Sequence, residues 1–366
     1  MSVRAAVMPG PGMPLEIREF PDPTPEEGEV ILDTLASEVC GTDVHLWHGR
    51  LDGVPYPIIP GHVSVGRIRE LRGVEADVLG RPLVPGDPVT FLDVHGTCHR
   101  CFHCQVASQP NRCPSRRVYG ITFPLDDGLL GGWSQAIRLL AGVQILKLPE
   151  SVPADRLIGG GCGLFTGFAA VERSDLPMGA TVLVQGTGPV GLSAVAFARL
   201  RGAGQILAIG DPDARLALAR RFGADVTLSL AATTREERRE RILALTDGRG
   251  VDVAIEAAGQ PSAVEEGLAL LRDGGSYVVA GHYTDTGSAT LNPHTLLNRK
   301  HVALRGQWGT DLRHLVGALR MLERHGDALP FEEVIGGRYG LDRVQEALED
   351  VEALRVTKAV VVPEDG

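Results

Sequence analysis

The chain has 366 residues, of which 43% are hydrophobic and 22% charged, and it carries a formal net charge of −10. This length and composition predict about two globular domains and exclude a disordered chain, a collagen and a small disulfide-held scaffold. The acidic balance and the lack of a basic run argue against nucleic acid as a partner.

The first part of the sequence predicts a β-rich region. Residues 1–14 contain no apolar core of signal-peptide length, so we expect a cytoplasmic protein. Residues 1–155 are rich in Pro and Gly, and the runs Val30–Leu35 and Val63–Ile68 predict strands.

From about residue 164 apolar strands and helices alternate, which is typical of a doubly wound parallel sheet. The predicted strands are Thr181–Val184, Gln205–Ile209, Asp252–Ile255 and Ser276–Ala280, with helices at Leu192–Leu200 and Ala214–Arg221. Towards the end of the chain we predict helices at Leu312–Glu323 and Leu341–Val351 and a strand at Ala359–Val362. The uncharged stretch 176–198 is long enough to span a membrane, but its Gly and Pro residues favour a strand, a turn and a helix. We therefore expect no membrane partner.

Four of the six cysteines follow the pattern C-x2-C-x2-C-x8-C. Such crowding suits four thiolates around one structural Zn²⁺, because short loops can aim several sulfurs at one ion. A disulfide pairing is disfavoured in a chain without a signal peptide, and the long last spacer disfavours an iron–sulfur cluster. The predicted ligands are Cys98, Cys101, Cys104 and Cys113.

The two remaining cysteines, Cys40 and Cys162, lie far from this segment, and His62 stands in the motif Pro60-Gly-His62. Taken singly, each is more often an ordinary buried residue than a ligand. Together they could supply two sulfurs and an imidazole with one coordination position left open, the arrangement of a catalytic zinc. The glycines around Cys162, at 159–161 and 163, predict a turn.

A second glycine-rich segment, Gly186-x-Gly188-x-x-Gly191, follows a predicted strand and precedes an apolar helix. In that setting it predicts a dinucleotide site, with the pyrophosphate at the helix N-terminus. Asp211 ends the next strand, where a carboxylate accepts a ribose 2′-hydroxyl and repels a 2′-phosphate. NAD is therefore favoured over NADP, although Arg215 could bind a phosphate.

In this order the motifs resemble those of the zinc-dependent medium-chain dehydrogenase/reductase superfamily, the alcohol and polyol dehydrogenases. The resemblance spans nearly the whole chain and implies an α/β fold. Residues 1–160 and 301–366 would form a GroES-like β-rich catalytic domain, with the structural zinc lobe at about 95–115, and residues 161–300 a Rossmann NAD(P)-binding domain. The resemblance also implies an active site in the cleft and a homodimer or homotetramer.

The resemblance further implies residue roles and two zinc ions per subunit. The catalytic zinc ligands would be Cys40, His62 and Cys162. Thr42 would hydrogen-bond the substrate hydroxyl, His45 would end its proton relay, and Asp43 would orient the ligand histidine. Contacts to the cofactor would come from Thr166, Gly186, Gly188, Pro189, Val190, Gly191, Asp211, Arg215 and Lys358.

One motif departs from the family pattern, because Gly61-His62-Val63 stands where most zinc members read Gly-His-Glu. That Glu sits behind the metal. We therefore expect a site that lacks a carboxylate, is more electrophilic, ionises a bound alcohol at lower pH and exchanges zinc ligands more slowly.

The favoured function is a zinc-dependent oxidoreductase that interconverts an alcohol and its ketone or aldehyde by hydride transfer to NAD(P). One alternative is a zinc-independent or zinc-altered reductase of an activated C=C or C=N bond that uses NAD(P)H, and another is a non-catalytic protein that kept the fold. Thr42 and His45 favour alcohol chemistry. Aromatic and histidine side chains around Trp47, Val94 and Tyr119 predict a pocket for a secondary, cyclic or polyol alcohol.

Overall fold

A computed structural model describes residues 2–363. The chain divides into two compact units. Unit 1 comprises Met1–Gly161, Asp311–Gly326 and Pro330–Gly366, and unit 2 comprises Cys162–Thr310 and Asp327–Leu329.

Unit 1 is built on a seven-stranded sheet in the order β16-β17-β3-β4-β5-β9, with β8 also paired to β3. These strands are β3 (Val30–Val39), β4 (Ser64–Leu71), β5 (Pro88–Phe91), β8 (Ala136–Leu139), β9 (Ile145–Lys147), β16 (Ile335–Tyr339) and β17 (Lys358–Val361). The predicted strands at 30–35, 63–68 and 359–362 are confirmed. The last strand, β17, pairs antiparallel with β3, matching Ala359 to Val39, and so brings residues 359–361 beside residues 37–39.

Further strands and helices belong to unit 1. They are β1 (Ser2–Val7) paired with β2 (Glu16–Pro21), β6 (Val94–His95) paired with β7 (Arg117–Val118), and the helices α1 (Gly41–Trp47), α2 (Phe102–Gln105), α8 (Leu312–His325) and α9 (Val344–Glu352). The core between these elements is apolar, and Trp133 and Tyr119 are its largest fully buried side chains.

Unit 2 is a six-stranded parallel sheet in the order β12-β11-β10-β13-β14-β15. Its strands are β10 (Thr181–Gln185), β11 (Gln205–Gly210), β12 (Val226–Ser229), β13 (Val251–Glu256), β14 (Leu271–Val279) and β15 (Ala303–Gly306). Its helices are α4 (Pro189–Leu200), α5 (Asp213–Arg221), α6 (Arg235–Leu245), α7 (Pro261–Leu270) and the second half of α3 (Ala154–Arg173).

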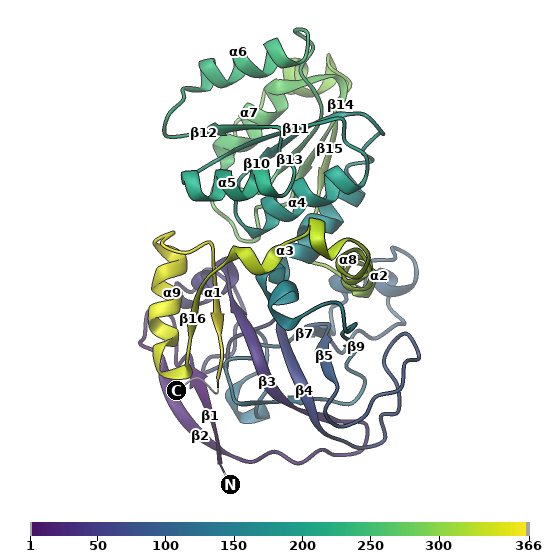
Figure 1. The fold of residues 1–366 in the computed structure, drawn as a ribbon, viewed down its shortest axis with the longest axis vertical. Coiled ribbons are helices and arrows are strands. Elements are labelled where there is room, and N and C mark those ends of the chain that lie inside the picture. Colours follow the sequence, from purple (N-terminus) through teal and green to yellow (C-terminus); the bar gives the residue numbers. More distant parts are fainter. Residues whose placement is uncertain (1, 364–366) are drawn as a thin grey trace. The chain divides into compact units, whose positions relative to one another are not determined.

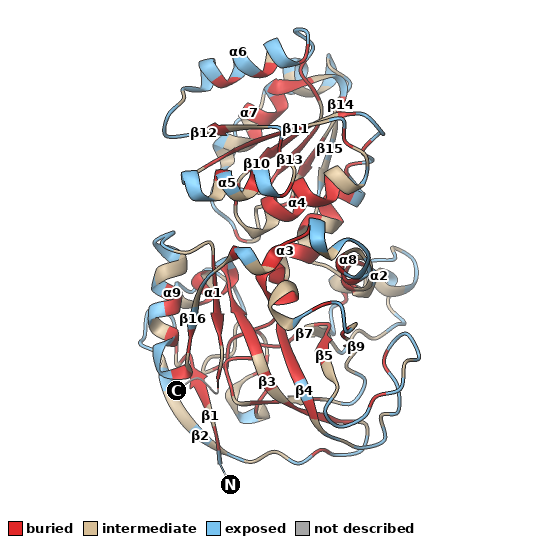
Figure 2. Cartoon of the chain, in the orientation of Figure 1, coloured by how far each residue is buried: buried red, intermediate tan, exposed pale blue. Residues whose placement is uncertain are grey.

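The strand order of unit 2 reverses between β10 and β13, as in a doubly wound sheet, so the predicted Rossmann fold is confirmed. Helices α4 and α5 lie on one face and α6 and α7 on the other (Figure 1). Figure 2 shows the strands buried between them, which explains their continuous apolar runs, while α6 is largely exposed. No helix within residues 2–363 has the length and apolar content needed to cross a membrane.

The predicted turn around Cys162 is wrong, because these glycines lie inside helix α3. One residue inside the helix, Gly161, has non-helical backbone angles, with φ +52° and ψ −142°. Only glycine adopts such a conformation readily, and the interruption kinks the helix directly before Cys162.

Candidate active site

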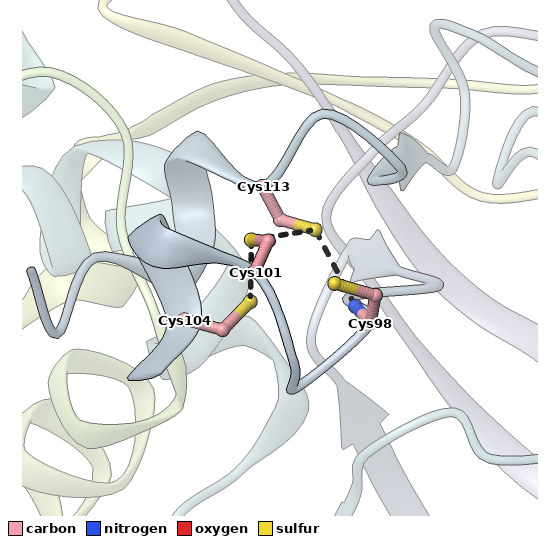
Figure 3. A group of neighbouring side chains, drawn as sticks. All are labelled: Cys98, Cys101, Cys104 and Cys113. Atoms are coloured by element: carbon pink, nitrogen blue, oxygen red, sulfur yellow. Dashed lines mark hydrogen bonds between the residues drawn. The ribbon is translucent and has the colours of Figure 1, made fainter. Parts of the chain in front are cut away.

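The four clustered cysteines converge as predicted, around the short helix α2 (Figure 3). The Sγ atom of Cys101 lies 3.6 Å from that of Cys104 and 3.9 Å from that of Cys113. Four sulfurs bound tetrahedrally to one zinc at about 2.3 Å each are about 3.8 Å apart, so the spacing fits a single ion. None of the six cysteines, which all lie within residues 2–363, forms a disulfide, so the disulfide alternative is not supported.

The pKa values of two thiols in the lobe, Cys98 and Cys113, are lowered towards the thiolate form that a metal needs, whereas burial raises the pKa of Cys104 to about 12. The backbone N–H of Cys98 donates to Cys113 Sγ at 3.4 Å and is the largest influence that lowers the pKa of Cys113 to about 6. The four sulfurs lie within 4.8 Å of one another, which suits one ion rather than a cluster of several irons.

A second group of metal-binding side chains forms around the end of β3. Its members, Glu38, Cys40, His62 and Cys162, each offer one ligand atom, and these atoms all lie within 4.8 Å of one another. Glu38 is on β3, Cys40 caps the N-terminus of α1, His62 precedes β4, and Cys162 follows the kink in α3. Segments distant in sequence thus deliver two sulfurs, an imidazole and a carboxylate to one place.

The surroundings of the His62 ring favour a positive charge. Its Nε2 lies 3.3 Å from Glu38 Oε1 and 3.9 Å from Cys40 Sγ, and the ring is buried. Burial alone would lower the pKa of His62, but Cys40, Glu38 and Asp43 outweigh it and raise this pKa well above its ordinary value. Electron-rich atoms that converge in a buried site need a cation between them, and Zn²⁺ suits this donor set.

Asp43 approaches the other nitrogen of the same ring. Its Oδ1 lies 4.0 Å from His62 Nδ1, and within residues 2–363 neither atom has a hydrogen-bond partner. The other oxygen of Asp43 accepts the backbone N–H of Cys40 at 2.8 Å, which fixes the carboxylate against helix α1. A proton on Nδ1 aimed at Asp43 leaves Nε2 free for a metal, which is how carboxylates orient ligand histidines.

Two core residues hold the ligand segments in place. Gly61, directly before His62, has φ +89°, and a Cβ there would lie 2.6 Å from both Ser37 Oγ and the Trp133 ring. The Trp133 indole N–H donates to the carbonyl of Glu38 at 3.0 Å. The backbone on both sides of the site is therefore tied to the core of unit 1.

Glu38 is the site residue that the sequence analysis missed. Its side chain is fully buried, and its Oε2 accepts from the ammonium group of Lys358, which is also buried. The expectation that the site lacks a carboxylate because of Val63 is therefore wrong. The backbone N–H of Glu38 donates to the Val63 carbonyl at 3.1 Å, so the two positions are neighbours across β3 and β4.

The predicted phosphate-binding turn lies in unit 2 between β10 and α4. Gly186 has φ +105°, and a Cβ there would lie 2.7 Å from the backbone of Ala257. Helix α4 begins at Pro189 with Gly188 as its N-cap; glycine has no side chain to cap the helix, so the N–H groups that follow Pro189 in the first turn are available to a ligand. A Cβ at Gly191 would overlap the carbonyl of Gly186, which explains the third glycine.

Asp211 and Arg215 follow the next strand, where the sequence places them. The Asp211 carboxylate accepts hydrogen bonds from the Ser229 hydroxyl, at 2.7 Å, and from the Ala231 N–H, at 2.8 Å. These bonds hold the carboxylate at the end of β11 while leaving it further lone pairs. Arg215 is half-buried on α5, and burial lowers its pKa.

Helices α3 and α4 join the metal ligand to the cofactor turn within unit 2. A Cβ at Gly163, next to Cys162, would lie 2.7 Å from Pro189 and 2.8 Å from the Val190 backbone. One turn later a Cβ at Gly167 would lie 2.5 Å from Ser193 Cβ. The small residues let the two helices approach closely, and Thr166, half-buried, lies between them in sequence.

We expect the Gly163→Ala variant to separate these helices. Its methyl group meets backbone atoms, which cannot rotate away, so the free energy of unfolding should fall by about 1–3 kcal/mol. Because α4 carries the phosphate turn, the dissociation constant of NADH should rise as well. Chemical denaturation and a fluorescence titration with NADH check both expectations, and unchanged values in both would show that the contact is not tight.

The other predicted site residues lie on elements of unit 1. Thr42 and His45 are one turn apart on α1, and the Thr42 N–H donates to Cys40 Sγ at 3.3 Å. Trp47 ends the same helix and donates to the Met13 carbonyl, and Val94 is half-buried in β6. Tyr119, expected in a pocket wall, is fully buried against Phe91 and Phe123, where it fills the core. Lys358 was expected against the pyrophosphate. Its ammonium group instead forms an ion pair with the Glu38 carboxylate.

Comparisons with known proteins give the same picture. Residues 26–150 match the alcohol dehydrogenase GroES-like domain, and residues 189–324 match the zinc-binding dehydrogenase domain. The chain is 34% identical over 361 residues to 5-exo-hydroxycamphor dehydrogenase of Pseudomonas putida, covering 98% of each chain. It is 29% identical to L-threonine 3-dehydrogenase of Pyrococcus horikoshii, covering 96% of this chain and 95% of the relative. The crystal structure of an alcohol dehydrogenase from Thermotoga maritima superposes with a TM-score of 0.95 at 35% identity, covering both chains fully.

A GroES-like β unit, a doubly wound unit and two groups of zinc-type ligands define a zinc-binding dehydrogenase. The chain belongs to the zinc-dependent medium-chain dehydrogenase/reductase superfamily. Within it, the chain is an alcohol dehydrogenase-like oxidoreductase.

Proposed function

We propose that this protein is a zinc- and NAD-dependent dehydrogenase of a secondary, cyclic or polyol alcohol. The observation that carries the proposal is the convergence of Cys40 and His62, both buried, and the half-buried Cys162 with the neighbouring carboxylate of Glu38. A second zinc would be held by the four cysteines of the lobe, where it stabilises the fold and does no chemistry.

The chemistry that a bound catalytic zinc supplies is polarisation of an alcohol or carbonyl oxygen. The protein's own residues prepare the place for it. Asp43, whose Oδ1 lies 4.0 Å from His62 Nδ1, would orient the ring so that Nε2 faces a bound metal, and the Cys40 sulfur accepts the N–H of Thr42.

Thr42 and His45 are suited to carry the alcohol proton away. Residues three apart lie on the same side of a helix, so both side chains can line one path. Burial lowers the pKa of His45, and Arg50 acts in the same direction, so the ring is neutral near neutral pH and can accept a proton. Because Thr42 and His45 are both present, the alternative function, reduction of a C=C or C=N bond, is not favoured.

The preference for NAD rests on Asp211. Its carboxylate is anchored by Ser229 and Ala231 at the end of β11, where it would repel a 2′-phosphate and accept a ribose hydroxyl. Arg215 would weaken this preference for NAD, because its guanidinium group could bind a 2′-phosphate.

The substrate class rests on the relatives. Hydroxycamphor and the 3-position of threonine, which give two of them their names, carry secondary hydroxyl groups. Another relative, from Mycolicibacterium smegmatis, is named for erythritol and L-threitol, which are polyols. We propose a substrate of the same kind and a homodimeric or homotetrameric assembly.

The test combines metal analysis with an activity panel. Elemental analysis of the purified protein should find about two zinc ions per chain. NADH formation should be faster with cyclic secondary alcohols or polyols than with long primary alcohols, and faster with NAD than with NADP. One zinc per chain together with no alcohol oxidation by either cofactor would overturn the proposal.

Replacing Thr42 with valine should slow alcohol oxidation while leaving the site intact. Valine matches threonine in shape but has no hydroxyl, so the proton path is cut and kcat/KM should fall by about 10²–10⁴-fold. Thr42→Ser keeps the hydroxyl and should retain most of the activity. Steady-state kinetics with both variants, at equal zinc content, check this; equal losses in the two would contradict a role for the hydroxyl.

A further inference from the structure

The carboxylate of Glu38 stands in the metal-binding group in a position that the comparisons do not assign. Its Oε1 faces His62 Nε2 at 3.3 Å, while its Oε2 accepts from Lys358. The two oxygens thus have different partners: one lies among the metal donors and the other is held by a buried cation. A purely structural ion pair would not need to direct one oxygen at the ligand histidine.

The fold makes room for this pair at some cost to its local structure. A Cβ at Gly161 would overlap Glu38 Oε2 and lie 2.7 Å from Lys358 Nζ. The non-helical backbone of Gly161 and the kink of α3 therefore coincide with the ion pair, and the next residue is the ligand Cys162. The same kink accommodates the carboxylate and brings Cys162 into the group.

Charge balance agrees with a carboxylate that acts on the metal. Buried charges must be paired, and a dication together with Lys358 balances two thiolates and one carboxylate when the imidazole is neutral. Without Lys358 the group would keep an excess negative charge. The lysine therefore compensates for a carboxylate that the usual set of two cysteines and one histidine does not require.

We propose that Glu38 is the fourth protein ligand of the catalytic metal in the absence of substrate, and that Lys358 holds the carboxylate when it withdraws. This proposal rests on the proposed function, since a catalytic zinc needs one position that a substrate can take. Four protein donors would close the site, so one must be displaceable. Glu38 is the one with a second partner, and its departure to Lys358 breaks no covalent bond and moves no proton.

The experiment measures zinc release to a chelator from the full-length protein. Glu38→Gln keeps the shape of the side chain but replaces the carboxylate by a weak ligand, so one of the two zinc ions should leave at least about tenfold faster. Glu266→Gln is the matched control, because Glu266 also forms a buried ion pair, with Arg238, away from the metal-binding groups. It should release zinc at the wild-type rate.

A second variant separates the lost ligand from the stranded lysine. In Glu38→Gln/Lys358→Met no buried ammonium is left unpaired, so stability should recover while zinc release stays fast. Recovery of slow release in this double variant would overturn the proposal, because the unpaired lysine and not the lost ligand would then explain the single variant. Release as slow as wild type in Glu38→Gln itself would also overturn it.

Cobalt shows whether Glu38 binds the metal directly. With Co²⁺ in the catalytic position, the visible absorption of Glu38→Gln should differ from wild type because a ligand has changed; identical spectra would contradict the proposal. Failure of the proposed function is a distinct result, since the wild type would then hold one zinc that Cys40→Ser leaves in place.

Discussion

Replacing Cys40 with serine should reduce the zinc content from about two ions per chain to one and abolish alcohol oxidation. Serine keeps the cap of helix α1, because its hydroxyl can accept the Thr42 N–H that Cys40 Sγ accepts in the structure. The substitution therefore removes a thiolate with little damage to the fold. Loss of metal polarisation is worth several kcal/mol in the transition state, so kcat/KM should fall at least about a thousandfold. Elemental analysis and steady-state kinetics on the same preparation measure both effects.

Cys98→Ser is the companion variant, because it removes a thiolate from the other group of ligands. It should also leave one zinc per chain, but the ion that remains is the one at Cys40, and the loss should appear as proteolytic sensitivity of residues 95–115. If Cys40→Ser retained both ions and its activity, the second group of ligands would not be a metal site.

The architecture of unit 2 could be predicted because its strands are buried on both faces. Runs such as Thr181–Gln185 and Val251–Glu256 are almost wholly buried and mostly apolar, and each is followed by a helix of ordinary length. Helix α3 could not be predicted, since consecutive glycines disfavour a helix locally. The glycines are there for tertiary reasons: a Cβ at Gly159 would overlap the Phe331 carbonyl, and one at Gly163 would meet Pro189.

The residues of the metal-binding group likewise include some that could be predicted from the sequence and one that could not. Thiolate and imidazole ligands restrict the residue types so strongly that the positions of Cys40, His62 and Cys162 stand out in the sequence. Glu38 has no such local signature, because glutamate before a cysteine is common and its partner, Lys358, lies 320 positions away. Only the pairing of β17 with β3 brings the two together.

The Gly161→Ala variant should lose both stability and the catalytic zinc. Alanine cannot adopt φ +52° and ψ −142° without strain of about 1–3 kcal/mol, and its methyl group would overlap the carboxylate of Glu38. Clearing the methyl group would require Oε2 to break its ion pair with the buried Lys358, and breaking a buried ion pair is costly. Relief must come from a shift of α3, which carries Cys162 out of the ligand group.

Gly142→Ala separates the two causes. Gly142 also has a positive φ, +85°, but within residues 2–363 no atom lies within 4 Å of the position that its Cβ would take. This variant should therefore show a backbone strain of about 1 kcal/mol and keep both zinc ions. Gly161→Ala should be destabilised by at least about 2 kcal/mol more and hold one zinc, because overpacking adds to strain and the metal site depends on the kink. Thermal denaturation and elemental analysis compare the stability and zinc content of the two variants. Equal stability and equal zinc content would contradict the prediction, because the kink would then have no part in assembling Glu38, Lys358 and Cys162.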